Sequence, residues 1–169
     1  DVPADTVGEL LVRGPNVLVG YWMKPATTAE AFRGGWFHTG DLGRIDADGY
    51  ITLVDRKKDM IISGGENVYP IEVEQVLFRH PGVLDAAVVG GPDDKWGERV
   101  VAVVVADPAA EQEPSADELI AWCRERLAHF KCPREVHLLP ELPRNATGKL
   151  LKTELRKRFT GVEGGVVQR

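Results

Sequence analysis

Residues 55–70 read DRKKDMIISGGENVYP, and the sequence has a different character on either side of this stretch. Before it, short alternating runs are separated by turn residues; after it, apolar residues recur at helical spacing or in β-branched runs. Within it, charged residues give way to an apolar triplet and then to Gly64 and Gly65, where the backbone is freest and a ligand can approach closely. The stretch predicts a hinge between two structural parts, with an ordinary strand, turn and helix start as the alternative.

A hairpin is predicted upstream of this stretch. Residues 42–46 and 50–54 alternate on either side of Asp48-Gly49, which is a strong hairpin pattern. Asp41 follows a glycine at the end of a bulky strand, and Arg56 lies just beyond the second hairpin strand, close to Asp41. Asp41 is therefore a candidate binding group, with a turn aspartate that caps its own backbone as the alternative.

Downstream, the pattern predicts a small domain of helices and buried strands. Pro70 suits the first position of a helix. Residues 83–89 and 100–105 are β-branched runs, and the second is apolar throughout, as in a central strand buried on both faces. Ser115 and Glu118 have the spacing of a capping box that opens a further helix. Strands and helices are thus both expected in this part.

Two residues of the downstream part are candidate ligand contacts. Trp96 lies in a polar loop, residues 92–99, and is either a packed lid or a ligand contact. Lys149 ends the run PRNATGK and is predicted to begin a basic helix, where its ammonium and free backbone donors would attract a phosphate. The run is not a Walker motif, because the upstream glycine spacing and the preceding strand are missing. A solvated lysine on a basic surface helix is the alternative.

Composition argues against several classes of function. A net charge of -5 argues against a general nucleic-acid binder. Cys123 and Cys132 have no metal-binding spacing and are typical of a reduced cytosolic protein. No apolar run reaches the roughly 20 residues that span a bilayer, and no triad, carboxylate pair or metal cluster suggests a hydrolase or metalloenzyme. We expect a cytoplasmic protein, with contact between its basic terminal helix and an anionic membrane surface as the alternative.

Four motifs, in order along the chain, resemble the carboxyl-terminal part of the adenylate-forming superfamily. That superfamily contains acyl-CoA synthetases, adenylation domains of nonribosomal peptide synthetases and beetle luciferases. The resemblance covers residues 8–159. The sequences GDLG, DRKKDMI and SGGENVYP are most similar to those of bacterial fatty-acyl-CoA ligases, including mycobacterial ones. The motifs are WFHTGD (36–41), DRKKD (55–59), SGGENVYP (63–70) and PRNATGK (143–149).

The resemblance implies a reaction and residue roles. These enzymes join a carboxylic acid to ATP as an acyl-adenylate, releasing pyrophosphate, and then transfer the acyl group to the thiol of coenzyme A, releasing AMP. By resemblance, Asp41 and Arg56 bind the ribose of ATP or AMP, Lys149 is the catalytic lysine of the first step, and Lys58 is the hinge. The residues that would contact CoA and its pantetheine arm are Gly64, Gly65, Trp96, Phe130, Lys131 and Arg134.

The resemblance also implies an α+β fold and domain boundaries. Residues 1–57 would be the end of a large N-terminal domain, with a β-hairpin or β-barrel-like portion, residues 58–160 a small mobile domain, and residues 161–169 a flexible tail. The chain starts at Asp1 without a methionine, as a fragment would. The family's phosphate loop, adenine segment, acyl pocket and Mg²⁺ ligands belong to the rest of the large domain. We expect the isolated chain to be inactive without it, with fatty acid, ATP and CoA as the small-molecule partners.

Two alternatives to a fatty-acid-CoA ligase remain. One is an adenylation enzyme that loads its acyl group onto a carrier-protein thiol; binding of CoA by the parent protein would separate the two. The other is a non-enzymatic interaction module of the same fold, against which the intact Asp41, Arg56 and Lys149 argue. Cys132 departs from the family pattern, because some relatives have a basic residue there.

Overall fold

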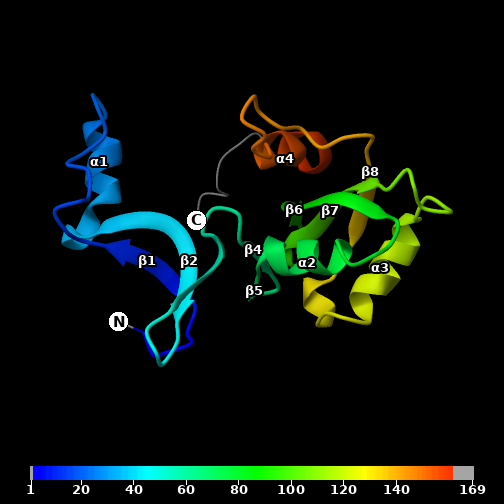
Figure 1. Ribbon diagram of the computed structural model, residues 1–169, viewed down its shortest axis with the longest axis horizontal. Helices are drawn as coiled ribbons and strands as arrows, with labels where there is room; N and C mark the ends of the chain where they lie inside the picture. The colour runs from blue at the N-terminus through cyan, green and yellow to red at the C-terminus, as the bar shows by residue number, and fades with distance from the viewer. Residues whose placement is uncertain (1, 162–169) are drawn as a thin grey trace. The chain divides into compact units, whose positions relative to one another are not determined.

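The computed structural model describes residues 2–161, which form two compact units that divide between Lys58 and Asp59 (Figure 1). Helices and antiparallel strands are both present, which confirms the α+β class. The division falls inside the 55–70 stretch, where the sequence pattern changes. Of the predicted flexible tail, all but Gly161 lies outside the described residues.

The first unit is an open antiparallel sheet with a short helix. Its strands lie in the order β1-β2-β3. Three strands are too few to close on themselves, so within residues 2–58 the barrel-like expectation was wrong and the hairpin expectation was right. The elements are β1 (Gly8–Val12), α1 (Pro25–Ala31), η1 (Arg33–Gly35), β2 (Phe37–Ile45) and β3 (Ile51–Arg56).

The turn between β2 and β3 is built by Asp46 and Gly49. The carboxylate of Asp46 accepts hydrogen bonds from the backbone N–H groups of Asp48 and Tyr50, at 3.0 and 2.9 Å. Gly49 has a φ of 88°, a left-handed conformation that glycine adopts without steric cost. The side-chain caps and the glycine together fix the register that pairs the end of β3 with β2.

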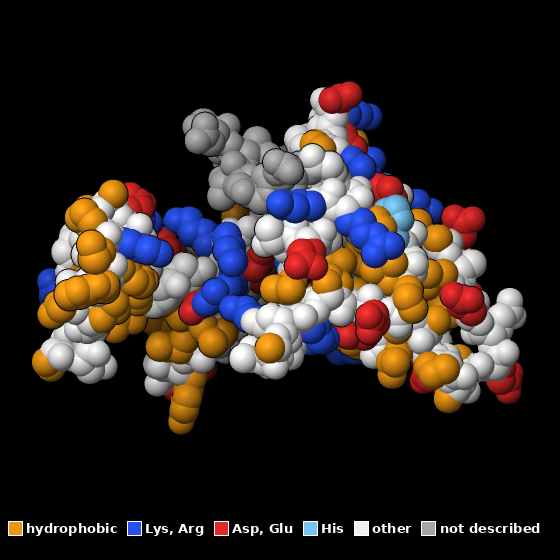
Figure 2. All heavy atoms as spheres, turned by 90° about the horizontal axis from the view of Figure 1, so that it is seen from above, with side chains coloured by type: hydrophobic (Ala, Val, Ile, Leu, Met, Phe, Trp, Pro, Cys, Tyr) orange, Lys and Arg blue, Asp and Glu red, His pale blue; other side chains and the backbone are white. Residues whose placement is uncertain are grey.

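The first unit buries little of its own apolar surface. Among residues 2–58 only Leu42 and Gly43 are buried. Large apolar side chains such as Val19, Trp22 and Leu53 are exposed, and several apolar side chains are visible on the face of this unit that Figure 2 shows. The unit therefore gains little stability from a core of its own.

The second unit has a larger sheet with helices on both faces. Four of its strands follow the order β5-β4-β7-β6, and β8 pairs in parallel with β7. The elements are β4 (Ile61–Ser63), β5 (Glu66–Val68), α2 (Pro70–Leu77), β6 (Val83–Asp93), β7 (Gly97–Ala106), α3 (Ala116–Arg124), η2 (His129–Lys131), β8 (Glu135–Leu138) and α4 (Lys152–Thr160).

Strand β7 is central, as its apolar run predicts. Val100, Ala102 and Val104 face a core with α2 and α3, whereas the alternate residues from Val101 to Val105 face a second core with Leu155 of α4. Successive side chains of a strand point to opposite faces, so α2 and α3 cover one face and α4 covers the other (Figure 1). The second unit therefore has two surfaces on opposite sides of the sheet, one on the side of α2 and α3 and the other on the side of α4.

Two of the three predicted helix starts, at Pro70 and at Ser115, are confirmed. Pro70 occupies the first turn of α2, where its missing N–H is not needed. Ser115 caps α3 by accepting a hydrogen bond from the backbone N–H of Glu118, and the Glu118 carboxylate accepts one in return from the backbone N–H of Ser115. These local features set where α2 and α3 begin.

Candidate functional site

Asp41 and Arg56 are direct partners across β2 and β3. Arg56 donates from Nε to Oδ1 of Asp41 at 2.9 Å, and the two side chains are 48% and 34% exposed. Gly40 precedes Asp41 with a φ of 74° and no side chain beside it, so this end of the hairpin is sterically open. The carboxylate pairs with Arg56 rather than capping a turn, and it has a second oxygen for a ligand hydroxyl.

Glu9 is a neighbouring group that the motifs do not reveal. Its Oε2 accepts from Lys57 Nζ at 2.9 Å, His38 Nδ1 at 3.1 Å and Arg33 at 3.2 Å. Burial tends to raise the pKa of Glu9, but the hydrogen bonds and charges of Lys57 and His38 outweigh it and hold the pKa below its usual value. The cluster ties β1 to β2 and to the residue that precedes Lys58.

The chain passes from the first unit to the second at Lys58. Immediately after it, Asp59 accepts a hydrogen bond from Arg156 of α4 at 2.7 Å, with both side chains mostly buried. Lys57 and Asp59 are therefore each tied into a different unit. The role of Lys58 as a hinge stays a prediction.

Gly64, Trp96 and Arg134 meet at one end of the second sheet. Gly64 donates its backbone N–H to the carbonyl of Trp96 at 2.8 Å, and its φ is 62°. A Cβ on Gly64 would lie 2.7 Å from the indole ring, so the ring packs directly against this glycine. On the ring, the Arg134 guanidinium lies 4.9 Å from the centroid. Three residues predicted to contact CoA thus form one aromatic and cationic group.

The turn that carries Trp96 is shorter than expected. Strands β6 and β7 extend into the predicted polar loop, which leaves residues 94–96 as the turn. Asp93 holds it by accepting from the backbone N–H groups of Trp96 and Lys95, at 2.9 and 3.0 Å. The hydrogen bond from Trp96 is the main reason that the pKa of Asp93 is lowered. Trp96 is half-buried and its backbone is fixed.

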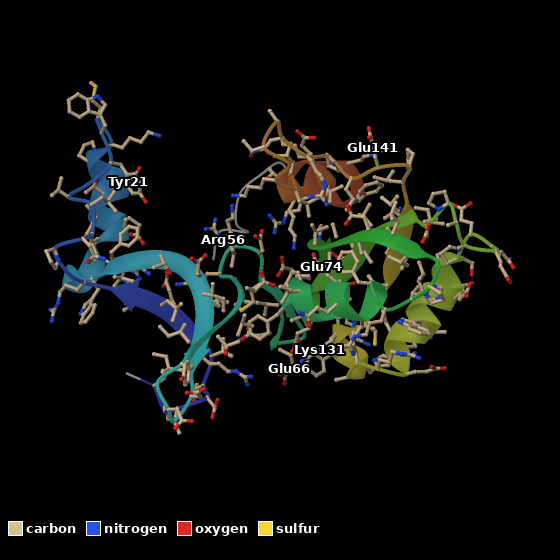
Figure 3. All side chains as sticks on the ribbon, viewed as in Figure 1. Tyr21, Arg56, Glu66, Glu74, Lys131 and Glu141 are labelled. Carbon is tan, nitrogen blue, oxygen red and sulfur yellow. The ribbon has the colours of Figure 1, made fainter. Side chains whose placement is uncertain are left out.

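Phe130 and Lys131 lie on η2, beside β5 (Figure 3). The Lys131 ammonium pairs with Glu72 of α2 at 2.7 Å, and Phe130 is 37% exposed. Cys132, which follows them, is buried in the core beneath α2 and α3, and burial raises its thiol pKa. Cys132 is therefore a core residue. Gly65 has a φ of 86° with open space beside it, so its backbone conformation is what requires glycine.

Lys149 lies on a closed loop rather than at the start of a helix. Arg144 and Leu150 form a β-bridge, and α4 begins only at Lys152, so the expected position at the positive end of the helix was wrong. Asn145 fills the loop: its Oδ1 accepts from the backbone N–H of Lys149 at 2.8 Å and from both the N–H and the hydroxyl of Thr147. The loop satisfies its own donors, which a helix start would have left free.

The Lys149 side chain is exposed, and its ammonium makes no ion pair or hydrogen bond with any of residues 2–161. The flanking Leu142 and Leu155 are buried in the core on the α4 face of the sheet, whereas Cys132, next to η2, is buried on the opposite face. The 144–150 loop and η2 therefore lie on opposite faces of the second unit (Figure 1), and Lys149 and the Phe130-Lys131 pair belong to these two faces.

Residues 2–161 contain no group of three or more His, Cys, Asp or Glu side chains placed to hold a metal ion. None of the helices that the structure describes is long and apolar enough to cross a membrane.

Comparison with known proteins identifies a matching family model and several similar proteins. A family model described as the AMP-binding enzyme C-terminal domain matches residues 72–149. The chain is 54% identical over 158 residues to a feruloyl-CoA synthase from Amycolatopsis sp, covering 94% of this chain and 32% of that protein. It is 49% identical over 153 residues to the long-chain-fatty-acid-CoA ligase FadD13 from Mycobacterium tuberculosis, covering 90% of this chain and 30% of that protein.

A solved structure of ATP-bound MatB from Rhodopseudomonas palustris is also similar. The TM-score is 0.88 with 41% sequence identity, over 96% of this chain and 32% of that one. The chain thus spans about a third of the length of the curated relatives that it matches. Residues 72–149 are an AMP-binding enzyme C-terminal domain, and the match together with the CoA-ligase relatives supports placing the chain in the adenylate-forming superfamily.

Proposed function

We propose that this chain is the C-terminal part of an AMP-forming acid-thiol ligase that makes acyl-CoA. The observation that carries the proposal is that Lys149 and the Phe130-Lys131 segment lie on opposite faces of one small sheet. A unit of this kind can present the lysine for one step and the other face for the next by rotating about a hinge at Lys58.

In the first step, an oxygen of the acid's carboxylate attacks the α-phosphorus of ATP, and the bond to pyrophosphate breaks. Asp41 accepts hydrogen bonds from the ribose hydroxyls, and Arg56, already bonded to Asp41, holds that carboxylate in place. Lys149 approaches the α-phosphate and the attacking carboxylate and stabilises the negative charge that gathers there. The ammonium is exposed and makes no ion pair with any residue of the described range 2–161, and the Lys149 backbone is held by Asn145, which supports this role.

In the second step, the CoA sulfur attacks the acyl carbon, the bond to AMP breaks, and the thiol proton leaves. Gly65, which has open space beside it, leaves room for the pantetheine arm near the backbone, and Gly64 lets the Trp96 ring pack against the backbone next to that path. Arg134 and Lys131 supply cations for the phosphates of CoA, and exposed Phe130 offers a ring for stacking.

We propose a fatty acid as the substrate. The motif sequences and the similarity to a long-chain-fatty-acid ligase support this choice. The similarity to a feruloyl-CoA synthase makes an aryl acid the second candidate. Mg²⁺, which accompanies ATP in such reactions, has no ligand set among residues 2–161. We also propose that the isolated 169-residue chain is inactive; fatty-acid-dependent consumption of ATP by it would overturn that statement.

The proposal is tested in the parent protein by measuring the half-reactions separately with Lys149→Ala. Acid-dependent pyrophosphate exchange should fall roughly 10² to 10³-fold, while thioester formation from pre-made acyl-adenylate and CoA should persist. Lys157→Ala, which removes an exposed lysine of α4, is the matched control and should leave both steps unchanged. If Lys149→Ala leaves exchange intact, the assignment of the lysine is wrong.

A further inference from the structure

Arg144 connects the Lys149 loop to the sheet. Its NH2 group pairs with Asp85 of β6 at 2.6 Å, and its NH1 group donates to the carbonyl of Gly148 at 2.9 Å. Gly148 is the residue that precedes Lys149, and its φ of 81° is a left-handed conformation that bends the chain there. One guanidinium thus holds the backbone next to Lys149 at a fixed distance from a strand of the core.

The contacts of the loop that do not involve Arg144 have a different structural role. Within the described part of the chain, residues 2–161, the hydrogen bonds of the Asn145 side chain stay inside the loop, to Thr147 and Lys149. Leu142 and Leu155 anchor the two flanks in the core. These contacts fix the shape of the loop and the positions of its ends, whereas the Arg144 pair fixes how its tip is oriented against β6.

We propose that Arg144, acting together with Asp85, is a positioning residue for Lys149 in acyl-adenylate formation; this rests on the function proposed above for Lys149. Without Arg144, the loop keeps the hydrogen bonds made by the Asn145 side chain but loses the one to the Gly148 carbonyl, and its tip can swing away from β6. An ammonium on a long side chain then spends less time at the α-phosphate. A displacement of about 1 Å can cost roughly a hundredfold in rate.

The pair is suited to orientation rather than to stability. The side chains of Arg144 and Asp85 are 45% and 25% exposed, and ion pairs this open to solvent add little to folding stability. The guanidinium of Arg144 is planar and donates in fixed directions, so it can bind a carboxylate and a carbonyl at the same time. The ammonium of a lysine fixes the direction of its hydrogen bonds less strictly. The two effects of a mutation, on folding and on rate, are therefore separable.

The test uses the parent protein and both half-reactions. Arg144→Ala should lower kcat of pyrophosphate exchange roughly ten- to a hundredfold, with KM for ATP and thioester formation from pre-made acyl-adenylate nearly unchanged. Arg144→Lys and Asp85→Asn should each give a smaller loss. Arg126→Ala is the matched control, because Arg126 also joins a carboxylate, that of Glu125, to a carbonyl in the same unit.

A double variant decides whether Arg144 acts through Lys149. In the Lys149→Ala background, Arg144→Ala should lower the residual exchange no further. If it lowers exchange by the same factor as in the wild type, or if it slows both half-reactions equally, the positioning role is overturned. If Lys149→Ala abolishes exchange but Arg144→Ala has no effect, the positioning role of Arg144 is overturned and the proposed function stands. If Lys149→Ala itself has no effect on exchange, the proposed function is overturned, and the positioning role falls with it.

Discussion

Nε of Arg56 lies 2.9 Å from Oδ1 of Asp41, between two residues that the β2–β3 register places directly opposite each other. The strand pairing presents the carboxylate with one oxygen engaged by Arg56. The second oxygen remains available to accept from a ribose hydroxyl.

Replacing Asp41 with asparagine should weaken ATP binding in the parent protein. The amide keeps the size of the side chain but loses the charge that accepts hydrogen bonds from Arg56 and the ribose. A hydrogen bond to a charged group contributes roughly 1.5 to 3 kcal/mol, so KM for ATP should rise about ten- to a hundredfold. Asp48→Asn, in the exposed turn of the same hairpin, is the control. An unchanged KM would remove Asp41 from the site.

Gly64→Ala should impair the second half-reaction more than the first. The added methyl would lie 2.7 Å from the Trp96 ring, so the ring must move away from the path proposed for pantetheine. KM for CoA should rise at least about tenfold, the effect of roughly 1.4 kcal/mol of lost binding, while pyrophosphate exchange changes little. Gly49→Ala carries the same penalty of a positive φ, at 88°, with open space beside it, and should leave CoA kinetics unchanged. Equal effects of both variants would contradict a specific role for Gly64.

The ion pair between Lys152 and Glu74 should matter for stability. Lys152 Nζ lies 2.7 Å from Glu74 Oε1, the same oxygen accepts from the backbone N–H of Val88, and the side chains are only 17% and 13% exposed. Lys152→Met leaves a nearly buried carboxylate without its cation and should cost about 2 to 3 kcal/mol, somewhat less than for a fully buried pair. Lys157→Met, on the exposed face of α4, is the control in urea denaturation.

Adding Glu74→Gln to Lys152→Met should restore part of that loss. The glutamine carbonyl still accepts from Val88, and no charge is left unpaired. If the double variant is less stable than Lys152→Met alone, the cost arises from packing rather than from the unpaired charge.

Cys123 should be unreactive in the folded protein. Burial raises the pKa of its thiol to about 12, and a thiol rather than a thiolate reacts slowly with alkylating reagents. Because the folded state binds this proton more tightly, the associated stability is complete below the unfolded pKa of roughly 8.5 and is lost as the pH rises toward 12. Iodoacetamide should label Cys123 at pH 8 only after denaturant is added. Rapid labelling of the native protein would show that the core around α3 opens readily.

Local sequence features predicted local structure well. The Asp48-Gly49 hairpin, Pro70 at the start of α2 and the capping box at Ser115 all formed where they were expected. Each depends on residues within a few positions of one another. Lys149 shows the limit of this reasoning: a glycine and a lysine before a basic helix suggested a helix start, but the bridge between Arg144 and Leu150 uses those residues for a closed loop.

By itself, the sequence determined the change of structure within residues 55–70, the central strand and the order of the four motifs, because periodicity, turn residues and motif spacing are local properties. The tertiary structure alone decided which distant groups meet. Arg144 lies 59 residues from Asp85, and Lys152 lies 78 residues from Glu74. Such pairs depend on how helices pack against the two faces of β7, and no local pattern specifies that packing. The same packing sets Lys149 and the Phe130-Lys131 pair on opposite faces of the sheet.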